Sequence, residues 1–186
     1  MAPKDSTGLL KSLRLVYSSY GGTGTLIRSG YLWASAFATI AMFPKVISFD
    51  WPVITIGIMP TLIGFTIAAF AIYFSVIDEK MRNALKAPAD ELGGRSPLMV
   101  VYSGIVHAVI VQITALIYAL VANAGPIDSA REALKNVTCF SEISESLIWL
   151  GYFCSGLGLL ISNYGVILIL ASALSMFNLL HIKSKF

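Results

Sequence analysis

The stretch VITIGIMPTLIGFTIAAFAIYFSVIDEKMRNALK, residues 53–86, decides the fold. Its first part, residues 53–77, carries no charged side chain. As an α-helix this part would extend about 37 Å, enough to cross a hydrocarbon core of about 30 Å. A charged segment, from Asp78 to Lys86, follows directly and belongs in water. The pattern predicts a membrane-spanning helix that ends in a polar element outside the bilayer.

Short side chains recur along this helix at steps of three and four residues, which is the spacing of a left-handed helix–helix seam. They are Gly57, Thr61, Gly64, Ala68, Ala71 and Ser75. Lipid provides no hydrophobic driving force between helices, so small residues on one face let two backbones pack closely. We therefore predict that Gly57, Gly64 and Ala68 form a helix-packing surface. The alternative is that such residues are simply common in membrane helices.

The composition places the whole chain in the membrane class. Hydrophobic residues make up 56% of the 186 residues and charged residues 12%, with a mean hydropathy of +0.78. Soluble domains carry about 25% charged residues. The first 22 or so residues lack an uninterrupted apolar core and a small-residue cleavage site, so no cleaved signal peptide is expected. We predict one all-α domain, residues 1–186, built as a polytopic membrane helical bundle.

Four transmembrane helices are predicted, over residues 26–47, 53–77, 98–123 and 147–181. They follow an amphipathic interfacial helix, residues 6–20, whose basic side chains face lipid headgroups. A free helix or a disordered tail is the alternative for that first segment.

The last apolar run exceeds one bilayer crossing, so it forms either a hairpin that turns near Asn163 or one long final helix. Gly151, Gly158 and Gly165, with serines between them, keep the three-and-four spacing through Asn163. A turn would have no reason to preserve that spacing, which favours one long helix. We expect its small face to meet the small face of residues 53–77.

Four spans place both termini on one side of the membrane. That side carries Lys4, Lys11, Arg14, Arg28, Lys80, Arg82, Lys86, Arg95, Lys183 and Lys185, and the other carries Lys45, Arg131 and Lys135. Positive residues concentrate on the cytosolic side of membrane proteins. We predict a multi-pass protein of the inner membrane with both termini cytoplasmic.

Three features of the spans and loops are candidates for function. His107 is the ionisable side chain predicted deep within a span and could sense protons or a ligand, although a histidine bonded within the bundle is the plainer interpretation. Pro60 removes one helical hydrogen bond and could act in gating, although such kinks are ordinary. The charged residues Glu79, Lys80, Arg82 and Lys86 form either a solvated face or a docking surface for a cytosolic protein.

The predicted spans hold no Asp or Glu and no metal-ligand motif, which disfavours proton or cation transport. We predict no metal, no cofactor, no direct nucleic acid binding and no catalytic residues. The GGTGT segment, residues 21–25, lacks the Lys-Ser/Thr ending of a phosphate loop. An enzyme acting on a lipid or quinone-like substrate would need activity that depends on His107.

Residues 59–86, MPTLIGFTIAAFAIYFSVIDEKMRNALK, resemble small bacterial four-span proteins in which a Pro-x-x-x-Gly-Phe span ends in an acidic-to-basic step. Together with the four-span layout, they resemble the membrane subunit of the Kiwa anti-phage defence system, a small four-helix protein that assembles as an oligomer and holds a cytosolic DNA-binding partner. The resemblance covers about one helix in detail and carries over no functional residue. It implies a sensor of membrane disturbance that relays a signal without catalysis.

The sequence therefore predicts a non-enzymatic, homo-oligomeric inner-membrane protein that anchors or signals to a cytosolic protein partner. The alternative is a small oligomeric channel or pore-forming protein, because glycine-rich helices can surround an oligomer axis.

Overall fold

The computed structural model describes residues 8–90, 93–127, 129, 132 and 141–183. Every named element in these residues is a helix. In chain order the elements are α1 (Leu9–Tyr20), α2 (Gly22–Ile27), α3 (Gly30–Ala41), α4 (Phe43–Ser48), α5 (Trp51–Val76), α6 (Glu79–Lys86), α7 (Pro97–Asn123) and α9 (Ser141–Lys183). The predicted all-α class is therefore confirmed for the part of the chain that the structure describes.

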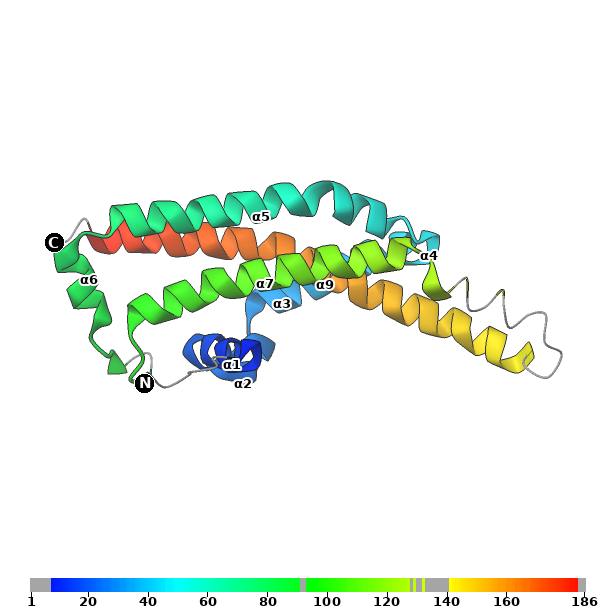
Figure 1. Ribbon diagram of the computed structural model, residues 1–186, viewed down its shortest axis with the longest axis horizontal. Coiled ribbons are helices and arrows are strands. Elements are labelled where there is room, and N and C mark those ends of the chain that lie inside the picture. Colours follow the sequence, from blue (N-terminus) through cyan, green and yellow to red (C-terminus); the bar gives the residue numbers. More distant parts are fainter. Residues whose placement is uncertain (1–7, 91–92, 128, 130–131, 133–140, 184–186) are drawn as a thin grey trace, which may run out of the picture.

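Three helices are long and apolar enough to cross a membrane, within α5, α7 and α9. They lie along one another in an elongated bundle, and the N-terminal part of α9 (yellow) extends past the other helices (Figure 1). The 43 residues of α9 form one helix of about 65 Å. The alternative of a hairpin near Asn163 is thus excluded, because the helix continues through that position.

The predicted first span, residues 26–47, is not one helix. The chain forms α2, α3 and α4 in this region, with breaks at Ser29 (ψ 124°) and Met42 (ψ 17°). Two local features account for the breaks. Ser29 is extended at the start of α3, and Pro44 suits the first turn of a new helix because its ring has no N–H to donate. With 12 residues, α3 is about 18 Å long, too short to cross a bilayer alone.

Although short, α3 packs beside the long final helix. The Asn163 Nδ2 atom of α9 donates to Thr39 Oγ1 of α3 at 3.0 Å. Thr39 in turn donates to the Ser35 carbonyl at 2.8 Å, and Ser35 is fully buried. This polar contact between partly buried side chains connects α3 to the middle of α9.

The amphipathic first helix is present as α1 and lies against α7. Its Tyr17 and Tyr20 rings contact the ring of His107, with centroids 5.5 and 5.0 Å apart. Lys11 and Arg14 are exposed. Gly21 ends the helix in the left-handed region at φ 118°, where a Cβ would also meet Thr25 and Arg95. The helix is thus docked on the bundle through its aromatic face.

The charged segment after α5 forms a separate helix, α6. Ile77 is extended (ψ 106°), and the Asp78 carboxylate then accepts the Met81 N–H at 2.8 Å. Such an N-cap begins a new helix and satisfies one of its free N–H groups. Buried Met81 and Leu85 pack with Leu98 at the start of α7, which fixes α6 to that end of the bundle.

Candidate functional site

The glycine face of α9 lies in the centre of the bundle, as the spacing predicted. Gly151, Gly158 and Gly165 are all buried. A Cβ on Gly158 would fall on the rings of Trp51 and Tyr118. At Gly165 it would lie 3.4 Å from Gln112 Cγ and from Met59 Cε. The small face of α9 is therefore a set of holes that larger side chains of α5 and α7 fill.

The small face of α5 does not meet the small face of α9, so that expectation was wrong. Gly57 and Gly64 are exposed, a Cβ added to either would have no neighbouring atom within 4 Å, and Ala68 is also exposed. The inward face of α5 is the opposite one, and its buried members are Trp51, Thr55, Met59, Thr66 and Tyr73. Bulky and hydroxyl side chains thus enter the α9 holes, and the small side chains of α5 remain on the outside.

Hydrogen bonds along this interface pair several of the buried polar side chains. The Trp51 indole N–H donates to Ser155 Oγ at 2.7 Å, and Ser155 donates to the Val46 carbonyl at 3.0 Å. About one helical turn further along α5, Thr55 Oγ1 donates to Ser162 Oγ at 3.1 Å. Pairs of this kind hold membrane helices together because lipid offers an unpaired group no partner.

Gln112 joins three helices at the middle of the bundle. It is fully buried on α7 and accepts from Thr66 Oγ1 of α5 at 3.1 Å. Its Nε2 atom donates to the Gly165 carbonyl of α9, also at 3.1 Å. Sequence reasoning assigned no role to Gln112, because its partners are 46 and 53 residues away along the chain.

His107 is buried on α7 under an aromatic cover. Its Nε2 atom lies 3.2 Å from the Tyr164 hydroxyl of α9, and the rings of Tyr17 and Tyr20 contact it from α1. The Nδ1 atom has no hydrogen-bond partner in the described part of the chain. The ring is thus satisfied on one side by the bundle, which is the plainer of the two interpretations, and its role in sensing stays a prediction.

The other predicted site residues lie on the surface. Pro60 is exposed, and α5 continues through it without ending. Glu79, Lys80 and Lys86 of α6 are exposed, whereas Arg82 is half-buried. The Arg82 guanidinium lies over the Phe74 ring, 5.9 Å from its centroid, and donates to the Ile77 carbonyl at 3.4 Å. Arg82 therefore holds α6 against α5, and the other three charges face outward.

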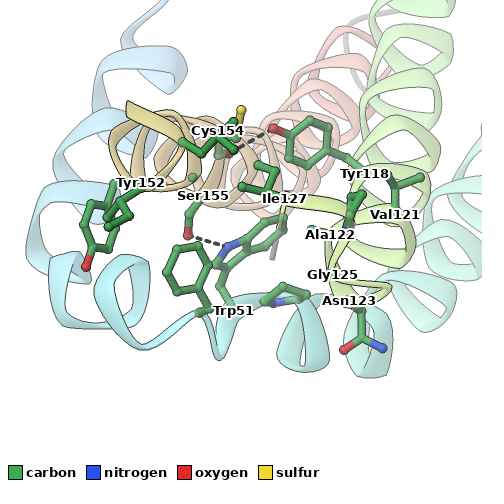
Figure 2. A pocket seen from close by; sticks show the side chains of 16 residues that line it. Trp51, Tyr118, Val121, Ala122, Asn123, Gly125, Ile127, Tyr152, Cys154 and Ser155 are labelled. Carbon is green, nitrogen blue, oxygen red and sulfur yellow. Dashed lines mark hydrogen bonds between the residues drawn. The ribbon is translucent and has the colours of Figure 1, made fainter. Parts of the chain in front are cut away.

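A cavity of about 460 Å³ lies at the opposite end of the bundle from α6, between the start of α5, the end of α7 and α9 (Figure 2). Its walls are mainly aromatic and aliphatic. They include Phe49, Trp51, Tyr118, Val121, Ala122, Ile127, Leu147, Ile148, Gly151 and Tyr152. Sequence reasoning missed this cavity, because its walls come from three segments that are distant along the chain.

The connection between α4 and α5 borders the cavity through Phe49. The Ser48 hydroxyl donates to Asp50 Oδ2 at 2.8 Å, and Lys45 Nζ lies 3.1 Å from the same oxygen. The hydrogen bond from Ser48 and then the charge of Lys45 lower the pKa of Asp50 below its ordinary value. The Asp50 side chain makes no cap bond to α5.

No group of three or more His, Cys, Asp and Glu side chains that could hold a metal occurs among the described residues. Comparison of the chain with protein-family models, with curated proteins and with solved structures gave no match.

Proposed function

We propose that this chain is a non-enzymatic, homo-oligomeric inner-membrane protein that anchors or signals to a cytosolic partner. The observation that carries the proposal is the outward small face of α5. It runs from Gly57 to Ser75, about 27 Å along the helix, which matches the hydrocarbon core of a bilayer. Within one chain nothing contacts Gly57 or Gly64 in the described residues. A second copy supplies the helix that such a face packs against.

Four bilayer crossings remain part of the proposal. In this arrangement α3 and α4 together form the first crossing, next to α9, and the membrane-crossing parts of α5, α7 and α9 form the others. The N-terminal helix α1, the helix α6 and the end of α9 then belong to the cytoplasmic side, in keeping with the charge distribution.

Self-association through α5 predicts a sharp difference between two alanine substitutions. Ala68→Leu places a bulky side chain on the outward small face, whereas Ala173→Leu adds the same atoms to an exposed position on α9. We expect Ala68→Leu to weaken self-association about tenfold, or about 1.4 kcal/mol, because the backbones can no longer approach. Sedimentation equilibrium in detergent measures this. Equal association of both variants and the original protein would contradict the proposed interface.

The exposed charges of α6 are the proposed contact for a cytosolic partner. Met81 and Leu85 fix the helix to the bundle, so its opposite face is presented at a constant position. Following the resemblance of residues 59–86, we extend the proposal to a sensor of membrane disturbance in anti-phage defence that relays to such a partner.

Charge reversal on α6 tests partner docking and defence together. Lys80→Glu with Lys86→Glu should abolish co-purification of a specific partner from the native host and remove protection against phage, while the melting temperature stays unchanged. The matched control is Lys11→Glu, an equally exposed charge on α1. Unchanged partner binding and protection in the α6 double variant would show that the partner does not dock on α6.

A channel is the second candidate, and one observation favours it. The outward face of α5 carries two hydroxyl residues, Thr61 and Ser75, among otherwise apolar side chains. In a ring of subunits this face could line a pore instead of packing against one neighbour. Conductance in planar bilayers separates the two candidates, since a relay protein is silent under varied voltage and pH.

A further inference from the structure

We propose that the cavity at the end of the bundle holds one acyl chain of a bilayer phospholipid. Its volume of about 460 Å³ falls within the range of about 300–1,000 Å³ that is typical of ligand sites. Four aromatic residues line it, namely Phe49, Trp51, Tyr118 and Tyr152. Figure 2 shows the Trp51 indole and the Tyr118 ring directed toward the space between α5, α7 and α9.

The buried polar side chains in the walls are already engaged with the protein, and Asn123, which also lines the cavity, is exposed, so the interior of the cavity favours an apolar occupant. The Trp51 N–H and the Ser155 hydroxyl are bonded as described above, and the Tyr118 hydroxyl donates to the Cys154 carbonyl at 3.0 Å. Among the described residues, the buried side-chain atoms without a partner lie elsewhere, on Tyr73, Arg82 and His107. Buried water needs two to four polar partners, which these side chains do not offer.

The surface around the cavity is continuous with a lipid-facing surface. Val121 of α7 lines the cavity and is 56% exposed, and Leu150 and Phe153 of α9 are 48% and 71% exposed beside the lining residues. An acyl chain from the bilayer can therefore enter between α7 and α9 without crossing a polar barrier. This position lies near the ends of the membrane helices, at the depth where aromatic side chains concentrate.

The lining favours a phospholipid over a free fatty acid as the source of the acyl chain. The described residues that line the cavity include no Lys, Arg or His. A free fatty acid would bring a carboxylate that needs a cationic or hydrogen-bonding partner. The headgroup of a phospholipid stays at the membrane surface, so only its tail needs to be accommodated.

Gly151 offers a way to fill the cavity by substitution. A Cβ at Gly151 would make ordinary contacts, 3.6 Å from Phe49 Cζ and 3.8 Å from Ile127 Cγ2. A leucine side chain there extends past these atoms into the cavity. Gly156 is the matched control, because it lies on the same helix, does not line the cavity, and has only Val46, at 4.0 Å, near its Cβ position.

Trp51 reports directly on an acyl chain in the cavity. The chain has three tryptophans, and Trp33→Phe with Trp149→Phe leaves Trp51 as the fluorophore. This protein is reconstituted into phosphatidylcholine vesicles with or without bromine on the acyl chains, since bromine quenches tryptophan at contact. We expect about a twofold loss of Trp51 fluorescence in brominated vesicles, because a chain in such a pocket contacts its walls.

A variant that fills the cavity tests whether an acyl chain occupies it. Gly151→Leu should restore most of the fluorescence, and Gly156→Leu should remain quenched. Ala122→Leu fills the same space from α7 and replaces Gly151→Leu if that variant does not fold. Equal quenching in the filled variants would assign the effect to lipids around the protein and overturn the proposal. Fluorescence that bromine does not lower in any variant would show that no acyl chain reaches Trp51, and would also overturn it.

Discussion

Replacing Gly158 with leucine should destabilise the bundle by about 3 kcal/mol, near the upper end of overpacking effects. Its Cβ position falls on two rings, those of Trp51 and Tyr118, and neither is the end of a flexible side chain. The indole cannot move away without breaking its hydrogen bond to Ser155 Oγ. The stacked Tyr118 ring, 5.9 Å from the indole ring, closes the other side. Unfolding in detergent, followed by Trp51 fluorescence, measures the change.

Gly64→Leu is the matched control, because it places the same side chain on the outward face of α5. No atom lies within 4 Å of the Gly64 Cβ position, so the stability of the single chain should stay within about 0.5 kcal/mol. Any effect of Gly64→Leu should appear in self-association instead. A Gly158→Leu protein as stable as Gly64→Leu would mean that α9 does not present its glycines to Trp51, and the arrangement of α5 on α9 would be wrong.

The packing face of α9 could be predicted from the sequence because small residues repeat many times on that one face of the helix. Glycine and serine alternate at seam spacing over four turns, and no other face of the helix has that property. The same repetition predicted that the helix continues through Asn163. A local pattern of this length defines both the helical periodicity and the packing face, so both could be predicted without knowledge of the contacts between helices.

On α5 the same rule did not identify the face that turns toward α9, and the reason is geometric. Spacing states which residues share a face, but it does not state which face turns inward. Met59, Thr66 and Tyr73 are also seven residues apart and form an equally regular row on the far side. Met59 of this row lies at Gly165 of α9, and Trp51 on the same face of α5 lies at Gly158, so this face turns inward. The shape of the neighbouring helix α9 determines which face of α5 turns inward, and the sequence of α5 alone does not contain that information.

The break in the predicted first span and the cavity were both missed, and the reasons differ. Hydropathy records the apolar run from Leu26 to Ile47 but does not record the backbone at Ser29 and Met42. The cavity depends on Trp51, Tyr118 and Tyr152 meeting from three helices. Contacts between distant segments create the cavity, whereas the breaks in residues 26–47 arise from the local backbone at Ser29 and Met42 and from Pro44 in the first turn of α4.

Gln112→Leu should cost about 2 kcal/mol, the second largest effect that we expect from a single substitution. Leucine fills similar space but removes the bonds to Thr66 Oγ1 and to the Gly165 carbonyl, so two helices lose their link through α7. Hydrogen bonds between membrane helices contribute about 0.6–2 kcal/mol each. The exposed Thr114→Val on the same helix is the control, since its hydroxyl bonds only to the Ile110 carbonyl of its own helix.

A double-mutant cycle with Thr66→Val separates the bridge from packing. The single hydrogen of the Thr66 hydroxyl has two acceptors within reach, Gln112 Oε1 at 3.1 Å and the Leu62 carbonyl at 2.9 Å, so Thr66→Val removes both the cross-helix and the local contact. If Gln112 accepts from Thr66, the two substitutions together should cost about 0.5 kcal/mol less than the sum of the two. Strict additivity in unfolding experiments would place Thr66 away from Gln112. It would then also count against the inward row of α5, because Thr66 occupies the middle of that row, between Met59 and Tyr73.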